Sequence, residues 1–328
     1  MNVNDYVNYY KNISFDDYKW NDVDNLVCAA FAYLPLGRRE IDGLFLPNKV
    51  LKKSNHPAAG LLFEVLDSIR YKGLELWDYV NIVNDETQFG AITIRLNDIC
   101  YVAFRGTDNS IIGWKEDFEL GYDYPVPAQR LAKDYLANHI KEDDKVIYVG
   151  GHSKGGNLAM ASVLEADDDI FKRIRFVYNN DGPGLLENVF NSNEFLRIEK
   201  KLKMFLPEES VVGILLNNTN RYQVVKSREN GFRQHDLFSW LCFGGVLVNG
   251  KLSVLSVKAK KIFDNWLEKQ DLEKRKRLVE GFFGLLKLTG AKNFNELKLS
   301  NINKLLSKIS IDDLGKKVLK DAISIFIK

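Results

Sequence analysis

The chain of 328 residues has few cysteines, and their pattern excludes two classes of protein. Cys28, Cys100 and Cys242 are widely spaced, odd in number and form no C-x-x-C pair. This argues against a disulfide-rich secreted scaffold and against a cysteine zinc site. Because no apolar secretory segment follows Met1, we expect a reduced, cytoplasmic protein.

Long hydrophobic runs and a strong net charge are also missing. The nearest approach to a membrane span, residues 241–248, is far too short to cross a bilayer. A net charge of +2 gives no reason to expect nucleic acid as a partner. With 45% hydrophobic and 27% charged residues, the composition is that of a globular protein with a sizeable core.

What is present is an alternation of helical and strand patterns, which predicts an α/β protein with a mostly parallel central sheet flanked by helices. Asn97-Asp98 separates two β-rich runs and predicts a hairpin. The nearly unbroken apolar run Lys145–Gly150 is typical of a parallel strand covered on both faces. The other expected segments are helices at Val23–Leu34, Gly60–Ile69 and Asn157–Ala166 and strands at Ile174–Asn180, Lys203–Pro207 and Tyr222–Ser227.

The pattern changes near Leu255, where glycine becomes rarer and apolar residues recur at helical spacing. No proline occurs beyond Pro207. We therefore divide the chain into a domain of residues 1–254 and a helical C-terminal extension of residues 255–328. The basic run Glu273–Arg277 is most simply a solvated helix face. With the apolar residues 282–286 that follow, it could instead make a peripheral membrane contact.

The stretch "VGGHSKGG" places Ser153 at a corner between an apolar strand and a helix. In a G-x-S-x-G elbow the serine hydroxyl projects from the top of a sheet, and small residues two positions away allow the helix to pack tightly on the strand. Gly151 and Gly155 occupy those positions. The following helix points its N-terminus at the serine, which makes the backbone N–H of Lys154 an expected oxyanion donor. The alternative is a glycine-rich turn that only joins strand to helix.

Four histidines are available as a general base for Ser153. His152 adjoins the serine and points elsewhere at an elbow, so we expect it to pack or orient. His56 precedes the sheet, and His139 lies in a helix. His235 follows the last expected strand, and a serine followed in the chain by a late histidine is the order of an α/β-hydrolase. We predict His235 as the base.

The third member of a triad, a carboxylate, has three candidates in this sequence. Asp181 directly follows a strand, at the end where functional loops gather. Glu208 and Glu209 follow the next strand. We favour Asp181 and keep Glu209 and then Glu208 as alternatives. A plain turn is the structural alternative for the "DGPG" that begins at Asp181.

A second oxyanion donor is expected from "YVAFRGTDNS", where a strand enters a tight turn at Gly106. The N–H of Thr107 would face the substrate of Ser153. A short amphipathic helix follows, and it is either a lid over the site or a helix packed permanently on the core. Its expected apolar side is Ile111, Ile112, Trp114 and Phe118.

Taken together, "VAFRGTDN", "GWKEDF" and "VGGHSKGGNLA" resemble the fungal-type, class-three triglyceride lipases. The ordered motifs "NNDGPG", "PEESVVG" and "QHDLFSW" are more similar still to a bacterial branch of that superfamily. The resemblance covers about residues 23–248. It implies an α/β-hydrolase fold, with Ser153 as nucleophile, His235 as base and the N–H groups of Thr107 and Lys154 as the oxyanion hole.

One position departs from the fungal pattern. Where those lipases carry the triad aspartate, this chain has Ser210, and a serine cannot stabilise an imidazolium by charge. We therefore expect either a serine hydrolase acting on a small-molecule or lipid ester, or a weak or inactive relative that binds a partner or membrane surface. No metal or organic cofactor is implied. The resemblance gives no counterpart for the C-terminal helices, and the sequence does not give the oligomeric state.

Overall fold

The computed structural model describes residues 1–47, 49–287, 289–293 and 296. Within them, one large sheet organises the molecule, and β9 and β10 form a separate two-stranded sheet. The strands of the large sheet are β1 (Arg39–Phe45), β2 (Glu75–Val83), β3 (Gln88–Leu96), β4 (Ile99–Phe104), β5 (Val146–His152), β6 (Ile174–Asn180), β7 (Leu202–Pro207) and β8 (Gln223–Val225), and those of the two-stranded sheet are Cys242–Phe243 and Val246–Leu247.

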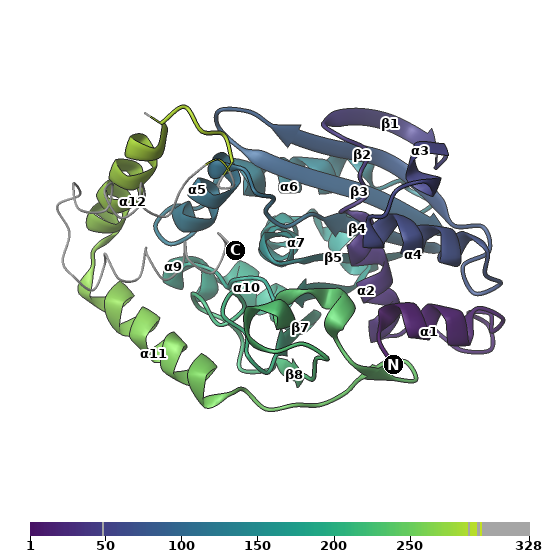
Figure 1. Cartoon of the computed structure of the whole chain (residues 1–328). Helices are drawn as coiled ribbons and strands as arrows, with labels where there is room; N and C mark the ends of the chain where they lie inside the picture. The colour runs from purple at the N-terminus through teal and green to yellow at the C-terminus, as the bar shows by residue number, and fades with distance from the viewer. Residues whose placement is uncertain (48, 288, 294–295, 297–328) are drawn as a thin grey trace.

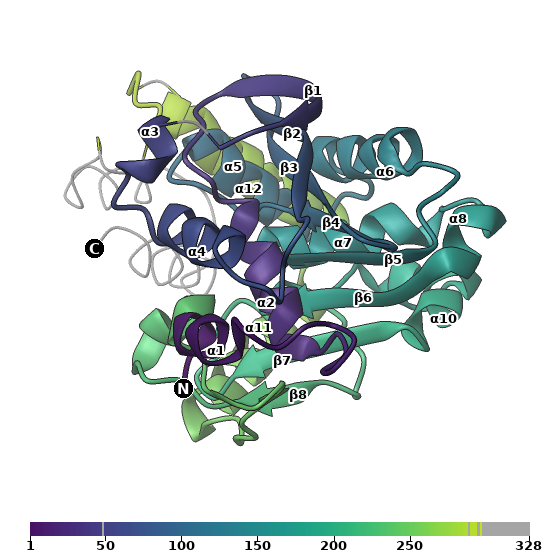
Figure 2. The ribbon, with the colours of Figure 1, turned by 90° about the vertical axis from the view of Figure 1, so that its right-hand side faces the viewer.

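The strands follow one another in chain order across the sheet, from β1 at the top of Figure 2 to β8 at the bottom. Strands β1 to β4 pair antiparallel, whereas β4 to β8 pair parallel. The predicted hairpin at Asn97-Asp98 joins β3 and β4, and Asn97 takes the positive φ of 53° that such turns favour. This arrangement confirms the predicted α/β-hydrolase fold.

Helices cover both faces of the sheet, as Figures 1 and 2 show. Along β4, Tyr101 and Ala103 join a core with α1, α2 and α4. Cys100, Val102 and Phe104 point to the other face, where α6, α7 and α10 pack. This alternation is the two-residue period of a strand buried on both sides. The helices are α1 (Val3–Tyr10), α2 (Asp22–Phe31), α3 (Lys49–Lys52), α4 (Pro57–Leu66), α5 (Ile111–Glu119), α6 (Pro127–His139), α7 (Lys154–Leu164), α8 (Asp168–Arg173), α9 (Glu187–Phe190), α10 (Asn193–Glu199), α11 (Val254–Lys269) and α12 (Leu272–Lys287), with 3₁₀ turns η1 (Gly231–His235) and η2 (Leu237–Ser239).

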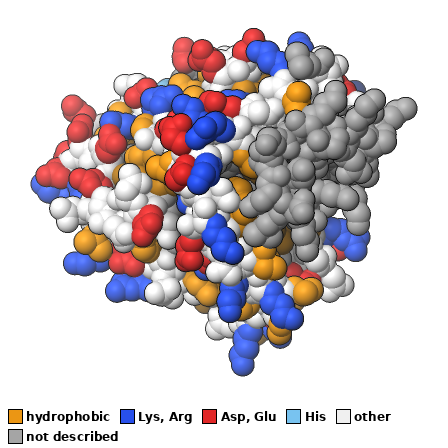
Figure 3. All heavy atoms as spheres, turned by 90° about the vertical axis from the view of Figure 1, so that its left-hand side faces the viewer, with side chains coloured by type: hydrophobic (Ala, Val, Ile, Leu, Met, Phe, Trp, Pro, Cys, Tyr) orange, Lys and Arg blue, Asp and Glu red, His pale blue; other side chains and the backbone are white. Residues whose placement is uncertain are grey.

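The C-terminal helix α12 lies beside α5 at the left of Figure 1, and α11 lies below them at the lower left. Phe282 and Phe283 of α12 are buried there with Ile111, and the ring of Phe283 lies 5.7 Å from that of Phe118. Of the residues 282–286, which the sequence offered as one part of an alternative membrane contact, Phe282, Phe283 and Leu286 are buried in this cluster, whereas Gly284 is exposed. The membrane contact stays a prediction. Apolar side chains do reach the surface on α11, where Val257 is exposed, and Figure 3 shows them interspersed with charges of both signs.

None of the described helices has the length and apolar character needed to cross a membrane.

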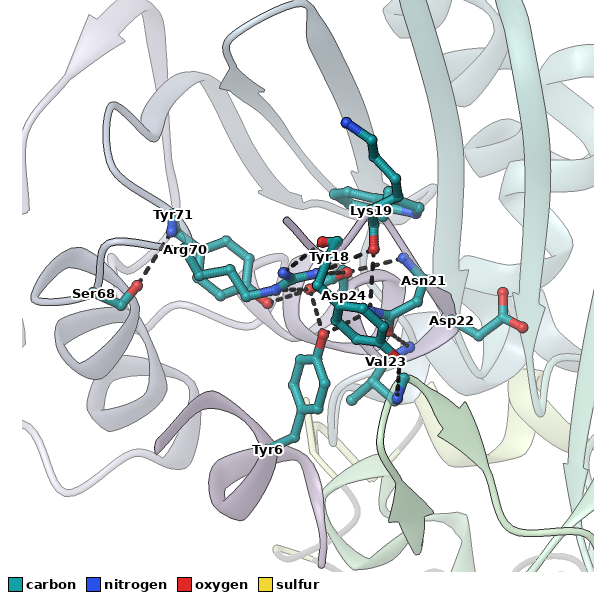
Figure 4. A network of polar contacts seen from close by, with 12 residues as sticks. Tyr6, Tyr18, Lys19, Asn21, Asp22, Val23, Asp24, Ser68, Arg70 and Tyr71 are labelled. Atoms are coloured by element: carbon teal, nitrogen blue, oxygen red, sulfur yellow. Dashed lines mark hydrogen bonds and ion pairs between the residues drawn. The ribbon is translucent and has the colours of Figure 1, made fainter. Parts of the chain in front are cut away.

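A buried ion pair joins the N-terminal helices to the segment that follows α4 (Figure 4). Arg70 Nη2 lies 2.6 Å from Asp24 Oδ2, and both side chains are fully buried. The Asp24 carboxylate also accepts hydrogen bonds from the hydroxyls of Tyr6 and Tyr71 and from the N–H of Asn21. With every oxygen satisfied, the charge of Asp24 is tolerated in the core.

Removing the cation of this pair is expected to destabilise the fold strongly. Arg70→Met leaves a buried carboxylate without its counter-charge, which costs about 3–5 kcal/mol. The measurement is the free energy of unfolding in urea. As a control, Lys145→Met removes one partner of the exposed pair with Asp98, and we expect a change within about 0.5 kcal/mol. Equal effects of the two substitutions would contradict the importance of the buried pair.

Candidate active site

Ser153 stands at a strained corner between β5 and α7. Its backbone has φ 58° and ψ −134°, a conformation that non-glycine residues rarely adopt and that clusters at functional sites. The corner needs its glycines. A Cβ on Gly155 would lie 2.1 Å from the carbonyl oxygen of Phe104, and one on Gly151 would lie 2.3 Å from that of Gly155. The geometry is that of the predicted nucleophile elbow.

Two backbone N–H groups lie next to this corner. The N–H of Lys154 is the first of α7, and that of Thr107 follows Gly106. The loop at Gly106 touches the elbow, since a Cβ there would lie 2.8 Å from Ser153 Cβ. Among the described residues, neither N–H donates to another protein group. Lys154 is the first residue of α7, where an N–H has no intrahelical partner and can bind an anion.

The structure brings His235 and Asp181 together although 54 residues separate them. His235 Nδ1 lies 2.6 Å from Asp181 Oδ2. If Nδ1 carries the proton, as the carboxylate favours, Nε2 is left as an acceptor. The other oxygen, Asp181 Oδ1, accepts from the hydroxyl of Ser210 and from the N–H of Gly213 at 3.1 Å. Asp181 is fully buried, and these contacts compensate its lost hydration.

Ser210, the residue that departs from the fungal lipase pattern, therefore contacts the carboxylate instead of supplying it. Asp181 follows β6 and Ser210 follows the neighbouring β7. Both loops reach the same edge of the sheet because the two strands are parallel. A carboxylate on either loop can thus meet the same imidazole.

The two alternative acids contact other groups. Glu209 Oε2 accepts from the N–H of Gly231 and from Gln234 Nε2, so it braces the segment that carries His235. Glu208 Oε1 accepts from the N–H of Lys251. Neither carboxylate is placed against the imidazole.

A chain of hydrogen bonds connects three parts of the site through Tyr33 and His152, which the sequence did not single out as a pair. The N–H of Gly106 donates to the Tyr33 hydroxyl, which lies 2.9 Å from His152 Nδ1. His152 Nε2 lies 2.6 Å from the backbone oxygen of His235. Because that oxygen can only accept, Nε2 carries the proton and Tyr33 donates to Nδ1.

His152 is suited to this structural position because it stays neutral. Burial lowers the pKa of His152 well below its usual range, and the nearby His235 lowers it further. The ring centroids of His152 and His235 are 4.5 Å apart, which places His235 beside the elbow. The expectation that His152 packs and orients is confirmed by its burial and its two hydrogen bonds.

The side chain of Lys154 points into the protein and fixes α5 against the elbow. Lys154 Nζ lies 2.8 Å from Glu116 Oε2 and donates to the backbone oxygen of Gln88. Glu116 Oε1 also accepts from the Thr87 hydroxyl and from the N–H of Ala128. Lys154 and Glu116 are fully buried, and breaking such a pair is costly. In this structure α5 is therefore held firmly against the elbow. That it opens as a lid stays a prediction.

A cavity of about 300 Å³ lies over the elbow. Ser153 lines it, and two of the expected lid residues, Trp114 and Phe118, form part of its wall. The other two lie outside the lining: Ile111 packs with α12, and Ile112 is half-buried. Small-molecule sites are typically this concave and apolar, with volumes of about 300–1,000 Å³.

Asp117 is an acid in this cavity that the sequence did not single out. It lines the wall with Ser153 and Lys154, and its Oδ1 is buried. Burial raises the pKa of Asp117 to about 7, and the positive charge of Lys154 opposes the rise most strongly. In the sequence, the only indication of a role for Asp117 was an acidic residue within the amphipathic helix expected after Gly106.

No cluster of three or more His, Cys, Asp or Glu with metal-binding geometry occurs in the described part of the chain.

The raised pKa of Asp117 makes stability depend on pH. In the unfolded chain this carboxyl ionises near pH 3.8, and in the folded protein near pH 7. Between these values the unfolded state binds fewer protons, so this group lowers the free energy of unfolding as pH rises. Asp117→Asn removes that dependence. We expect the stability of the variant relative to wild type to rise from about pH 4 to about pH 7 and to level off above.

Urea unfolding at a series of pH values measures this difference. Asp85→Asn, at an exposed bend, is the matched control for replacing a carboxylate by an amide, and we expect it to change the free energy of unfolding by no more than about 0.5 kcal/mol. A flat profile for Asp117→Asn would show that the carboxyl is not held neutral by burial.

Known proteins place the chain in a family. Two solved structures are similar: M37 lipase, at 15% identity over 59% of this chain and 69% of that one (TM-score 0.40), and the lipase of Rhizopus microsporus var. chinensis, at 16% identity over 54% of this chain and 76% of that one (TM-score 0.30). No curated protein sequence matches significantly. The model of the Mbeg1-like family matches residues 65–284, about two thirds of the chain, and this protein therefore belongs to the Mbeg1-like family.

Proposed function

We propose that this protein is a serine hydrolase that cleaves a carboxylic ester through an acyl-enzyme intermediate. One observation carries the proposal. His235 lies 2.6 Å from the buried carboxylate of Asp181 and next to the elbow that presents Ser153. A nucleophile, a base and a residue that orients the base, held by three separate loops, form the constellation that acyl transfer requires.

In the proposed reaction, Ser153 Oγ attacks the ester carbonyl carbon while His235 Nε2 accepts the hydroxyl proton. The C–O bond to the alcohol then breaks, and His235 returns the proton to the leaving alkoxide. Water, deprotonated by His235, attacks the acyl-enzyme, and the proton goes back to Ser153 as the acid is released. Asp181 holds the imidazole and stabilises its cationic form.

The N–H groups of Thr107 and Lys154 are proposed to bind the oxyanion that forms on the carbonyl oxygen. Their support is that both adjoin the elbow and neither donates to another described group. Preorganised donors of this kind cost no reorganisation during the reaction. Asp117, neutral below about pH 7, adds little negative charge near the oxyanion under mildly acidic conditions.

An ester of an apolar acid is the substrate class that the surroundings of Ser153 favour. Trp114 and Phe118 present aromatic surface to the cavity.

A cytoplasmic location is consistent with the free thiols of Cys28, Cys100 and Cys242, which are all buried.

An active-site-directed fluorophosphonate tests the nucleophile. We expect wild type to be labelled at one serine, Ser153→Ala to lose the label, and His235→Ala to be labelled at least about 10³-fold more slowly because the hydroxyl is no longer deprotonated. Intact-mass spectrometry after timed exposure gives the rate. Ser162→Ala, in the same helix, is the control and should label normally. A folded wild type that resists the probe would favour a non-catalytic binding protein.

The acid is tested by amide substitutions at the three candidates. Asp181→Asn keeps the shape of the site but removes the charge that holds the imidazole, and we expect kcat to fall by roughly 10⁴-fold. Glu208→Gln and Glu209→Gln are the matched controls. We expect at most about tenfold effects from them, because their carboxylates contact backbone and Gln234 rather than His235. The assignment fails if Asp181→Asn hydrolyses p-nitrophenyl esters at the wild-type rate.

A further inference from the structure

The cavity over Ser153 is built in large part by the C-terminal helices. The rest of the wall comes from α5 and from the loop after β7, which supplies Ile214 and Leu216. Without α11 and α12 the cavity would be open to solvent on that side. The residues that these two helices contribute include Ala259, Phe263, Trp266 and Leu267 from α11 and Leu278 and Val279 from α12.

Specific contacts hold the two helices in this position. α11 begins beside the loop after β7, where the N–H of Ser253 donates to the backbone oxygen of Glu208 at 2.7 Å. Lys260 Nζ then reaches the backbone oxygen of Ile214. At the other end, Arg275 donates to the backbone oxygens of Gly121, just beyond α5, and of Leu267, in the last turn of α11. These bonds fasten α11 and α12 to both walls of the cavity.

Most of the cavity wall is apolar. The cation of Lys154 is neutralised by Glu116, whereas Arg275 keeps its charge and donates its Nε and both terminal nitrogens to backbone oxygens. Burial keeps Asp117 neutral up to about pH 7. What remains is aromatic and aliphatic wall with a nucleophilic hydroxyl at its margin. Such a site binds a hydrocarbon chain favourably through the hydrophobic effect.

We propose that α11 and α12 form the acyl-binding wall of the enzyme and set the length of the acyl chain that it accepts. This inference rests on the proposed function, since the chain it describes is the one joined to Ser153 in the acyl-enzyme. Ala259 is the position that limits depth. It is the smallest residue of the α11 wall, and it packs against the cluster of Met204, Leu206 and Ile214 under the cavity.

The test compares kcat/KM for p-nitrophenyl acetate, butanoate, octanoate and hexadecanoate. In wild type we expect about a fourfold rise per added methylene while the chain still enters the cavity, the equivalent of about 0.8 kcal/mol each. Ala259→Phe fills the cavity with a ring. We expect its octanoate-to-acetate ratio of kcat/KM to fall at least about tenfold.

Val257→Phe provides the matched control. Val257 lies on the same helix, is 54% exposed and does not line the cavity, so its variant should keep the wild-type chain-length profile. Circular dichroism melting establishes that both variants are folded. An unchanged profile in a folded, probe-reactive Ala259→Phe protein overturns the proposal while leaving the serine mechanism intact.

A second measurement separates this inference from the proposed function. Binding of butanoate, octanoate and hexadecanoate to Ser153→Ala, followed by calorimetry, needs no catalysis. Affinity that rises with chain length and is reduced for octanoate by adding Ala259→Phe supports the acyl wall even if wild type resists the probe. Absence of binding for all three, together with a flat ester profile, rules it out.

Discussion

The tight contact between α7 and β5 is the constraint on which the candidate site depends. Gly155 meets the backbone of Phe104 so closely that no side chain fits, and Gly151 meets Gly155 in the same way. Because helix and strand approach this far, the residue between them must turn in a strained conformation, with φ 58° at Ser153. The surrounding packing maintains that strain, and the result is a hydroxyl held at the margin of a cavity.

Hydrogen bonds transmit this geometry to the other parts of the site. From Gly106 through Tyr33 and His152 to the backbone of His235, each link joins a different loop at the same edge of the sheet. Asp181 then holds the imidazole of His235. If His235 and Asp181 act as proposed, this network holds them in place before substrate binds, which is the preorganisation that acyl transfer needs.

The contact between Asp181 and Ser210 shows how two parallel strands bring the loops that follow them to the same edge of the sheet. Asp181 and Ser210 follow neighbouring strands and hydrogen bond to each other, so the carboxylate occupies one loop and its hydrogen-bonding partner the other.

The change of composition near Leu255 was a reason to separate the last helices from the domain. In the structure α11 and α12 share a cavity with α5 and Ser153, and the family match also extends through residue 284. The division of the chain at residue 254 stays a prediction, and any boundary there runs through the wall of the cavity.

The sequence by itself determined the features that depend on neighbouring residues. The period of apolar positions located α2, β5 and β6, and glycine spacing located the elbow at Ser153, because both reflect local backbone geometry. Two strands of the large sheet escaped this reasoning: β1 is a largely exposed edge strand and β2 carries a bulge that interrupts its alternation. Only the tertiary structure placed Asp181 rather than Glu209 against His235, paired Lys154 with Glu116 and put α11 over Ser153. These contacts join residues far apart in the chain, and they follow from strand order and helix packing, which no local pattern records.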